Sequence, residues 1–409
     1  MAQKRSKPVT LRTLPDEFRA PAAVLDRIGA LRDTLDSATQ RIARGLRPAE
    51  STDRKRKIAA RQSVQRGRAL TVADVDTQER IIGLDDLLPV GFLSRGLLAA
   101  RSVARLHVEL LGLYGTGFLV APDMLMTNNH VLPQPNLAAA TRVEFELFDA
   151  TGRSIAPREV CLDPERFFFT HAALDVTVVA LRDSADTRAA TEDLGWHPMI
   201  AQEGKIRLGD PVNIIQHPGG RSKKVVVHNS NLLHIENREK ECAETTDAGA
   251  EDDGSRRDPY LWYSSDTERG SSGAPVFNVR WEVVGVHRRS VPDTNKKGEL
   301  IDADGDPIDA EAFRMNPDLA VWIANEGTRT SRIVAALEKA RFDRSQLAAM
   351  RDDLLALWEG SRGHNKGQEA AARTTRVPGD VGLESAAVGG QTVRAGGITL
   401  QITIAPDNR

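Results

Sequence analysis

Residues 266–275 read DTERGSSGAP and contain a Gly-x-Ser-Gly turn around Ser272. Glycine adopts backbone angles that are closed to other residues, so this turn can be tight enough to expose the serine hydroxyl. It can also point the backbone N–H groups of Gly270 and Ser272 at one spot. A serine is a weak nucleophile unless a base takes its proton and such N–H groups hold the oxyanion. The stretch therefore predicts a nucleophile at Ser272 and an oxyanion hole from Gly270 and Ser272.

A base for this serine is expected at the end of a buried strand. Residues 115–120 (GTGFLV) and 124–132 (MLMTNNHVL) predict strand, turn and strand, followed by His130. Farther on, Asp175 begins the apolar stretch of residues 176–181, where a carboxylate is costly unless it is hydrogen-bonded. Pairing with the Nδ1–H of His130 would satisfy that carboxylate and fix the imidazole tautomer. The sequence thus predicts a triad of His130 and Asp175 with the serine.

Around these motifs the composition and the spacing of apolar residues change twice along the chain. Residues 1–90 are charged and poor in glycine, with an amphipathic helix predicted over residues 22–46. From Leu98 to Trp322, short apolar stretches alternate with Gly, Pro and Asp turns, which is typical of a β-sandwich or barrel. Helical spacing returns from Ile333 to Trp358, with a break near residues 341–345.

The motifs TNNHV, LDVTVVAL and GSSGAPVFN, in this order, resemble those of bacterial trypsin-like serine peptidases, close to the V8-like glutamyl endopeptidase branch. TNNHV is also similar to HtrA proteases, although the helical and linker-like region after residue 340 differs from their PDZ modules. The resemblance extends from Leu98 to Leu337. It implies a mainly β, chymotrypsin-like double β-barrel with the triad between the barrels. It also implies acyl transfer through a covalent acyl-enzyme, with no metal or organic cofactor.

The predicted organisation has five parts. They are a helical, basic N-terminal region (1–90), a peptidase domain (91–340), a C-terminal helix (341–360), a flexible linker (361–390) and a β-strand tail (391–409). In the tail, apolar residues alternate from Ile398 to Ile404 with no obvious partner strand nearby, so this strand could add to another sheet. The first and last parts are the candidate docking sites for a regulatory protein.

The resemblance implies two conflicting substrate preferences. Asp266 matches the acid that binds Arg or Lys in trypsin-like enzymes, whereas Thr267 and His287 match residues that bind a Glu carboxylate in the V8-like branch. Arg288 and Arg289 would attract an acidic side chain or pair with Asp266. The sequence therefore leaves the preference open, with acidic favoured slightly over basic. The segment Arg288–Ser290 is expected to hydrogen-bond the substrate backbone as an added strand.

Three further features of the sequence are interpreted as having no part in catalysis. His217 lies in a turn after an apolar strand and is expected to be structural rather than the base. Arg80-Ile81 resembles a zymogen cleavage site, but the usual acid before the nucleophile is replaced by Ser271, so an ordinary strand entry is favoured. Cys161 and Cys242 lack metal-binding spacing and are expected to be free thiols.

Composition excludes several classes of protein. Lys and Arg total 55 and Asp and Glu 57, a net charge of −2 that argues against a dedicated nucleic-acid binder. The basic residues 54–68 are interpreted as a solvated linker or helix face, the acidic segment 236–258 as a mobile insertion, and Asp302–Asp306 as a hairpin turn rather than a calcium loop. Neither a secretory signal nor an apolar stretch long enough for a membrane span is found, which predicts a cytoplasmic protein without a membrane partner.

These features together predict a serine endopeptidase that acts on protein or peptide substrates. By analogy, it resembles regulated intracellular bacterial proteases, such as defence proteases, that couple the catalytic domain to a sensor. The alternative is a catalytically latent scaffold that uses the protease fold as a binding surface.

Overall fold

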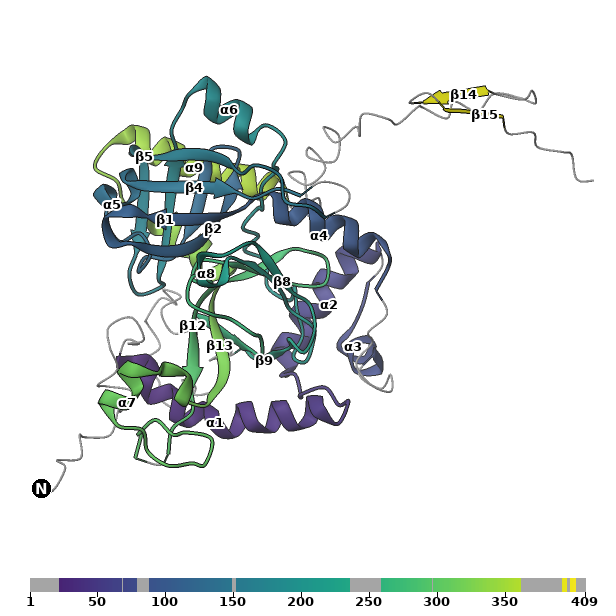
Figure 1. The fold of residues 1–409 in the computed structure, drawn as a ribbon. Coiled ribbons are helices and arrows are strands. Elements are labelled where there is room, and N and C mark those ends of the chain that lie inside the picture. Colours follow the sequence, from purple (N-terminus) through teal and green to yellow (C-terminus); the bar gives the residue numbers. More distant parts are fainter. Residues whose placement is uncertain are drawn as a thin grey trace, which may run out of the picture. The chain divides into compact units, whose positions relative to one another are not determined.

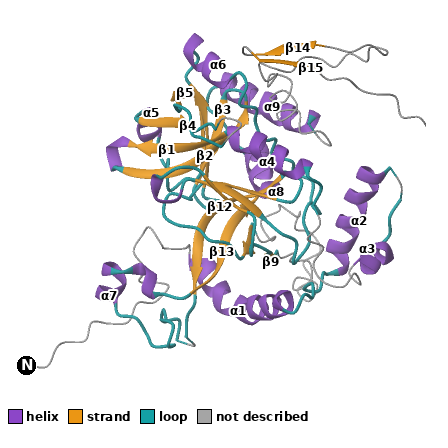
Figure 2. Cartoon of the chain, turned by 45° about the vertical axis from the view of Figure 1, so that its right-hand side comes forward, coloured by secondary structure: helices purple, strands orange, loops and turns teal. Residues whose placement is uncertain are grey.

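The computed structural model describes residues 22–67, 69–78, 88–148, 152–235, 259–295, 297–361, 392–395 and 398–401. It separates Met1–Arg373 from Thr374–Arg409, and the first of these units holds two β-sheets with helices before and after them (Figures 1 and 2). Among the residues described, no helix is long and apolar enough to cross a membrane. The Arg80-Ile81 sequence, the segment 236–258 with Cys242 and most of the predicted linker lie outside the described residues.

The first sheet is a closed antiparallel barrel in the order β1-β2-β3-β6-β5-β4. Strand β6 is buried along its whole length, and its apolar residues belong to the main hydrophobic cluster of the protein. Pairing of β1 with β4 closes the barrel. Its strands are β1 (Val103–Val108), β2 (Leu113–Ala121), β3 (Met124–Thr127), β4 (Thr141–Phe145), β5 (Arg158–His171) and β6 (Val176–Leu181).

The second sheet has the order β8-β7-β11-β12-β13-β10-β9 and curls back on itself. A β-bridge between Pro211, just before β7, and Asn231, just before β9, brings its two sides together. The predicted mainly β fold with two barrels is therefore confirmed, with the second barrel less regular than the first. Its strands are β7 (Asn213–Gln216), β8 (Lys224–Val226), β9 (Leu232–His234), β10 (Tyr260–Tyr263), β11 (Pro275–Phe277), β12 (Val283–Pro292) and β13 (Trp322–Arg329).

The first two helices of the chain pack on the second barrel. Helix α1 (Ala22–Ala43) buries Leu31 and Leu35 in a cluster with Trp262 of β10. Helix α2 (Thr52–Arg66) begins at an Ser51 cap and is followed by α3 (Val72–Gln78) and α4 (Gly91–Arg101). This confirms the predicted N-terminal helix.

The interpretation of the basic residues 54–68 as solvated is wrong for two of them. Arg54 is buried, binds Glu50 at 2.6 Å and donates to the Ile206 carbonyl oxygen at 2.9 Å. Arg61 is buried as well and forms an ion pair with Glu282 of the second barrel. Their contacts with Ile206 and Glu282 attach α2 to the second barrel. Both partners are far away in the sequence, so the residues around each arginine do not indicate these contacts.

Helices α8 (Thr330–Lys339) and α9 (Ser345–Gly360) follow the second barrel, and the predicted break between them is confirmed. The indole of Trp358 donates to the Val120 carbonyl oxygen at 2.7 Å, so α9 returns to the first barrel. Shorter helices are α5 (Pro135–Ala139), α6 (Ala185–Thr191) and α7 (Ala310–Met315). The Asp302–Asp306 turn is confirmed, since the Asp302 carboxylate accepts the N–H groups of Asp304 and Asp306.

The tail forms a hairpin of its own. Strand β14 (Thr392–Ala395) pairs antiparallel with β15 (Ile398–Gln401). The expectation that the tail strand has no nearby partner is therefore wrong, because residues 392–395 supply one. Residues 402–404 of the predicted strand lie outside the described residues.

Candidate active site

Asp175 lies in the turn between β5 and β6, immediately before the buried strand. Its φ of +53° is a left-handed conformation that aspartate tolerates better than most residues. The Asn128 amide donates to the Asp175 carbonyl oxygen at 2.8 Å and helps to hold this turn. Asn128 lies in the TNNHV motif, but sequence reasoning assigned it no role.

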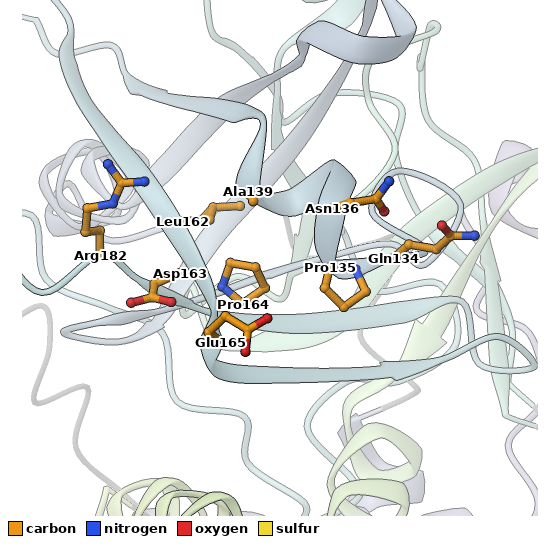
Figure 3. A pocket seen from close by; sticks show the side chains of 9 residues that line it. All are labelled: Gln134, Pro135, Asn136, Ala139, Leu162, Asp163, Pro164, Glu165 and Arg182. Atoms are coloured by element: carbon orange, nitrogen blue, oxygen red, sulfur yellow. The ribbon is translucent and has the colours of Figure 1, made fainter.

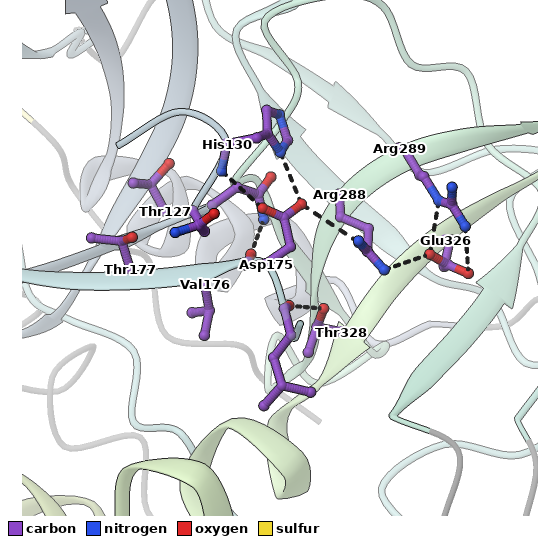
Figure 4. A network of polar contacts seen from close by, with 12 residues as sticks. Thr127, His130, Asp175, Val176, Thr177, Arg288, Arg289, Glu326 and Thr328 are labelled. Carbon is purple, nitrogen blue, oxygen red and sulfur yellow. Dashed lines mark hydrogen bonds and ion pairs between the residues drawn. The ribbon is translucent and has the colours of Figure 1, made fainter. Parts of the chain in front are cut away.

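His130 contacts the Asp175 carboxylate twice. The backbone N–H of His130 donates to Oδ1 at 2.9 Å, and its ring Nδ1 lies 2.8 Å from Oδ2 (Figure 4). The carboxylate side chain is 9% exposed, whereas the histidine side chain is 45% exposed. The pair is thus anchored at its acidic end and open to solvent at the imidazole.

The environment of Asp175 favours the ionised carboxylate. Burial by itself would raise its pKa, but His130 and Arg288, together with the hydrogen bonds from His130, lower the pKa to about 2. The carboxylate is therefore charged at neutral pH and can orient an imidazole.

Protonation of Asp175 is expected to destabilise the protein in acid. Its pKa falls from 3.8 to about 2 on folding, which corresponds to about 2 kcal/mol of unfolding free energy above pH 4. That contribution disappears as the pH falls through the folded pKa. Urea unfolding between pH 6 and pH 2 should show a smaller loss of stability for Asp175→Asn than for the unchanged protein. Equal losses would contradict the assignment.

Ser272 lies in a tight turn between two glycines with φ of +90° at Gly270 and +87° at Gly273. A side chain at Gly273 would collide with the Thr116 carbonyl oxygen and the Thr127 hydroxyl. The Thr116 N–H donates to the Ser272 carbonyl oxygen at 2.8 Å, which ties the turn to β2 of the first barrel. Glycine is therefore required here both for the backbone conformation and for the close approach.

Two N–H groups of this turn have no acceptor within the described residues: those of Gly270 and Ser272. The peptide between Arg269 and Gly270 is oriented by a 2.5 Å bond from the Gly219 N–H to the Arg269 carbonyl oxygen. The Thr116 hydroxyl donates to the Gly270 carbonyl oxygen at 2.7 Å. Because the Arg269 carbonyl and the Gly270 N–H belong to one peptide plane, the bond from Gly219 also fixes the direction of the Gly270 N–H.

The Ser272 turn and the His130–Asp175 pair are linked through the first barrel. The Thr127 hydroxyl, three residues before His130, donates to the carbonyl oxygen of Thr116, whose N–H in turn holds Ser272. Among the hydrogen bonds of the described residues, none joins the Ser272 hydroxyl to His130. Catalytic hydrogen bonds are often long in the absence of substrate and shorten only in the substrate complex.

Comparison with known families identifies the region that carries these residues. Residues 115–286 match the model of the trypsin-like peptidase domain. The match runs from β2 to β12, leaves out β1 and β13, and includes His130, Asp175 and Ser272. The V8-like branch suggested by the sequence is not separately supported.

A curated protein is similar to this chain in sequence. The uncharacterized protein y4fB of Sinorhizobium fredii (strain NBRC 101917 / NGR234) is 36% identical over 311 residues, which are 72% of this chain and 44% of that protein. The chain thus spans less than half of the length of this curated relative.

Solved structures are similar at low identity. The inactive form of the Rv3671c protease of M. tuberculosis is 18% identical, with a TM-score of 0.34 over 61% of this chain and 95% of that one. A serine endoprotease from Yersinia pestis is 14% identical, with a TM-score of 0.38 over 65% and 70% of the two chains. A Glu endopeptidase is 15% identical, with a TM-score of 0.32 over 56% and 85%.

The structure places the predicted specificity residues in different surroundings. Asp266 is exposed, and Gln216 donates to its carbonyl oxygen at 2.9 Å. Thr267 is half-buried and lies 2.7 Å from Asn325 Oδ1, which also accepts the Ser290 hydroxyl at 2.9 Å. Asn325 was missed from the sequence, although it neighbours the buried acid Glu326 in strand β13.

His287 is buried and lies 2.7 Å from the Tyr263 hydroxyl through its Nδ1. Burial lowers the pKa of His287 to about 3, assisted by the charge of His130, so its imidazole is neutral at physiological pH. The same burial raises the pKa of Tyr263 well above its usual value. The imidazole of His287 is therefore a neutral group that is shielded from solvent.

Arg288 and Arg289 do not pair with Asp266. Both guanidinium groups lie 3.0 Å from Glu326 Oε1, and Glu326 is fully buried on β13. The alternative that one of these arginines neutralises Asp266 is therefore wrong, because the nearer carboxylate of Glu326 takes both.

The remaining candidates are accounted for structurally. His217 is buried, and its Nδ1 lies 3.0 Å from the Arg221 carbonyl oxygen. Cys161 is free and exposed. A pocket of about 700 Å³ lies between α5 and residues 162–165 of β5 (Figure 3), and the predicted site residues do not line it. The described residues contain no group of His, Cys, Asp and Glu side chains arranged to hold a metal ion.

Proposed function

We propose that this chain is a serine endopeptidase that cleaves protein substrates through an acyl-enzyme on Ser272. The observation that carries the proposal is the double contact of His130 with an ionised, buried Asp175. This pair is linked through Thr127 and Thr116 to the Ser272 turn, which has two N–H groups without an acceptor among the described residues. The match of residues 115–286 to the trypsin-like peptidase domain supports it.

In this mechanism His130 acts as general base and then as general acid. Its Nε2 takes the proton of the Ser272 hydroxyl while Oγ attacks the substrate carbonyl carbon. The N–H groups of Gly270 and Ser272 bind the resulting oxyanion. The imidazolium then protonates the leaving amine, and a water molecule activated by the same histidine hydrolyses the acyl-enzyme. Asp175 stays ionised and holds Nδ1–H.

The proposed preference is for substrates with an acidic side chain, and a preference for a basic side chain is the alternative. Arg288 and Arg289 share Glu326, so an acidic side chain would be bound by neutral groups such as Thr267, Ser290 and His287. A basic side chain would instead rely on the exposed Asp266. Regulation through the end regions and action in the cytoplasm stay predictions.

A fluorophosphonate probe tests the proposal without knowledge of the substrate. We expect the full chain to form one covalent adduct, mapped by mass spectrometry to Ser272, and the Ser272→Ala variant to form none. Modification requires an activated hydroxyl and an oxyanion hole, which the alternative of a latent scaffold lacks. Failure of the folded protein to react at Ser272 would contradict an active endopeptidase and favour the latent scaffold.

A further inference from the structure

A β-bulge places two consecutive arginines on one side of β12. In the pairing with β13, His287 lies opposite Gly327 and Arg289 opposite Glu326, so Arg288 is the additional residue. Consecutive side chains of a regular strand point to opposite faces, but a bulge changes that alternation. Arg288 and Arg289 therefore both reach Glu326 (Figure 4).

Arg288 continues from Glu326 to Asp175. Its Nη1 donates to Glu326 Oε1 at 3.0 Å, and its Nε lies 3.5 Å from Asp175 Oδ2. That Oδ2 atom is the one that faces His130 Nδ1 (Figure 4). The Arg288 side chain is 5% exposed and the Glu326 side chain is 0% exposed, so solvent screens this contact only weakly.

Other residues of the second barrel hold the same turn of the first barrel. The Tyr260 hydroxyl donates to the Ala173 carbonyl oxygen at 2.7 Å, and its ring lies 4.6 Å below the Arg288 guanidinium. The Thr328 hydroxyl donates to the Leu174 carbonyl oxygen at 2.6 Å. Side chains of β10, β12 and β13 thus converge on residues 173–175.

The charges in this cluster balance. Arg288 and Arg289 carry two positive charges, and Asp175 and Glu326 carry two negative charges. Without Arg288, the two buried carboxylates would share only Arg289, which contacts Glu326. A buried charge without its partner is strongly unfavourable. Arg288 therefore supports the ionised Asp175 together with His130, whose charge and hydrogen bonds also favour the carboxylate.

We propose that Arg288 is a positioning residue, which acts from the second barrel to orient the Asp175 carboxylate on His130. This inference rests on the proposed function and reassigns a residue that the sequence placed in substrate binding. Glu326 completes the arrangement by holding the guanidinium. The groups that face Asp175 are His130 and Arg288, with Tyr260, His287 and Glu326 behind them.

Arg288→Gln in the full chain tests the proposal, with Arg61→Gln as a matched control. Arg61 is also a buried arginine that shares a largely buried glutamate, Glu282, with a second arginine, Arg280. Each variant thus removes one of the two arginines that share a carboxylate. Of the two arginines that are replaced, only Arg288 contacts Asp175. The comparison separates positioning from general loss of stability.

The first measurement does not need turnover. The proton between His130 Nδ1 and Asp175 is followed as a low-field NMR resonance, assigned by its loss in Asp175→Asn. Arg288→Gln is expected to shift or broaden this resonance, whereas Arg61→Gln leaves it unchanged. An unchanged resonance in a folded Arg288→Gln protein would overturn the inference even if the chain were not a peptidase.

The second measurement uses peptidase activity. We expect Arg288→Gln to lower kcat by about 10- to 100-fold with little change in KM, because a misplaced base slows chemistry more than binding. Loss of the positive charge should also move the acid limb of the rate profile to higher pH. Arg288→Lys keeps the charge and should restore that limb, which also covers the case in which the glutamine variant does not fold. Equal effects of Arg288→Gln and Arg61→Gln on kcat would contradict positioning.

Discussion

Replacement of Ser272 by alanine is expected to abolish cleavage of a mixed peptide library. The change removes the Oγ atom that forms the acyl-enzyme in the proposed mechanism, and losses of about a million-fold are typical when such a nucleophile is deleted. The fold should persist, because the turn is held by backbone contacts of Ser272 with Thr116 and by Gly273 with His287. Mass spectrometry of the peptides reads the outcome.

Ser271→Ala is the matched control for this experiment. Ser271 is buried, and its hydroxyl accepts the Glu268 N–H at 3.1 Å, so its loss costs about 1 kcal/mol of stability without removing the nucleophile. Cuts that persist in Ser272→Ala would disprove the assignment of Ser272. The residue before each wild-type cut also decides between acidic and basic preference, since Glu implicates His287 and Arg or Lys implicates Asp266.

Asp175→Asn is expected to lower kcat by about 10⁴-fold. Asparagine can still accept the His130 N–H through its side-chain oxygen, so the turn should keep its geometry. Its amide, however, is no longer a charged acceptor for Nδ1–H, and the imidazole then adopts the tautomer that cannot take the serine proton. Labelling of Ser272 by a fluorophosphonate should slow in parallel, and single-turnover kinetics measures both rates.

Asp193→Asn is the control for the loss of a carboxylate from an ion pair. Asp193 pairs with Arg101 of α4 and Arg158 of β5, and these partners also lower its pKa, with burial acting in the opposite direction. Its replacement should affect stability and leave kcat within about threefold of the unchanged protein, because it has no contact with the site. A similar fall in kcat for both variants would show that Asp175 acts through stability alone.

Local patterns predicted the strands and the principal helices for definite physical reasons. Alternation of apolar residues with Gly, Pro and Asp turns marks buried strands, and a repeat of three to four residues marks the helix of residues 22–43. The prediction that the tail strand has no nearby partner was wrong, because a strand of four residues such as Thr392–Ala395 is too short to show a clear alternation. Arg54 and Arg61 differed as well, since a basic helix gives no indication of which distant carboxylates it will meet.

The candidate site shows the same difference between local patterns and long-range contacts. The sequence by itself determined the residue types and the tight turn: a serine between two glycines, a histidine after a buried strand and an aspartate before one. Tertiary structure alone decided which charges meet, because the two barrels bring residues 175 and 326 to either side of Arg288. A bulge in β12 and burial of Glu326 create that cluster, and neither leaves a periodic signal in the chain. Chemistry that depends on one turn can therefore be predicted from sequence, whereas the electrostatic environment of Asp175 depends on packing between barrels.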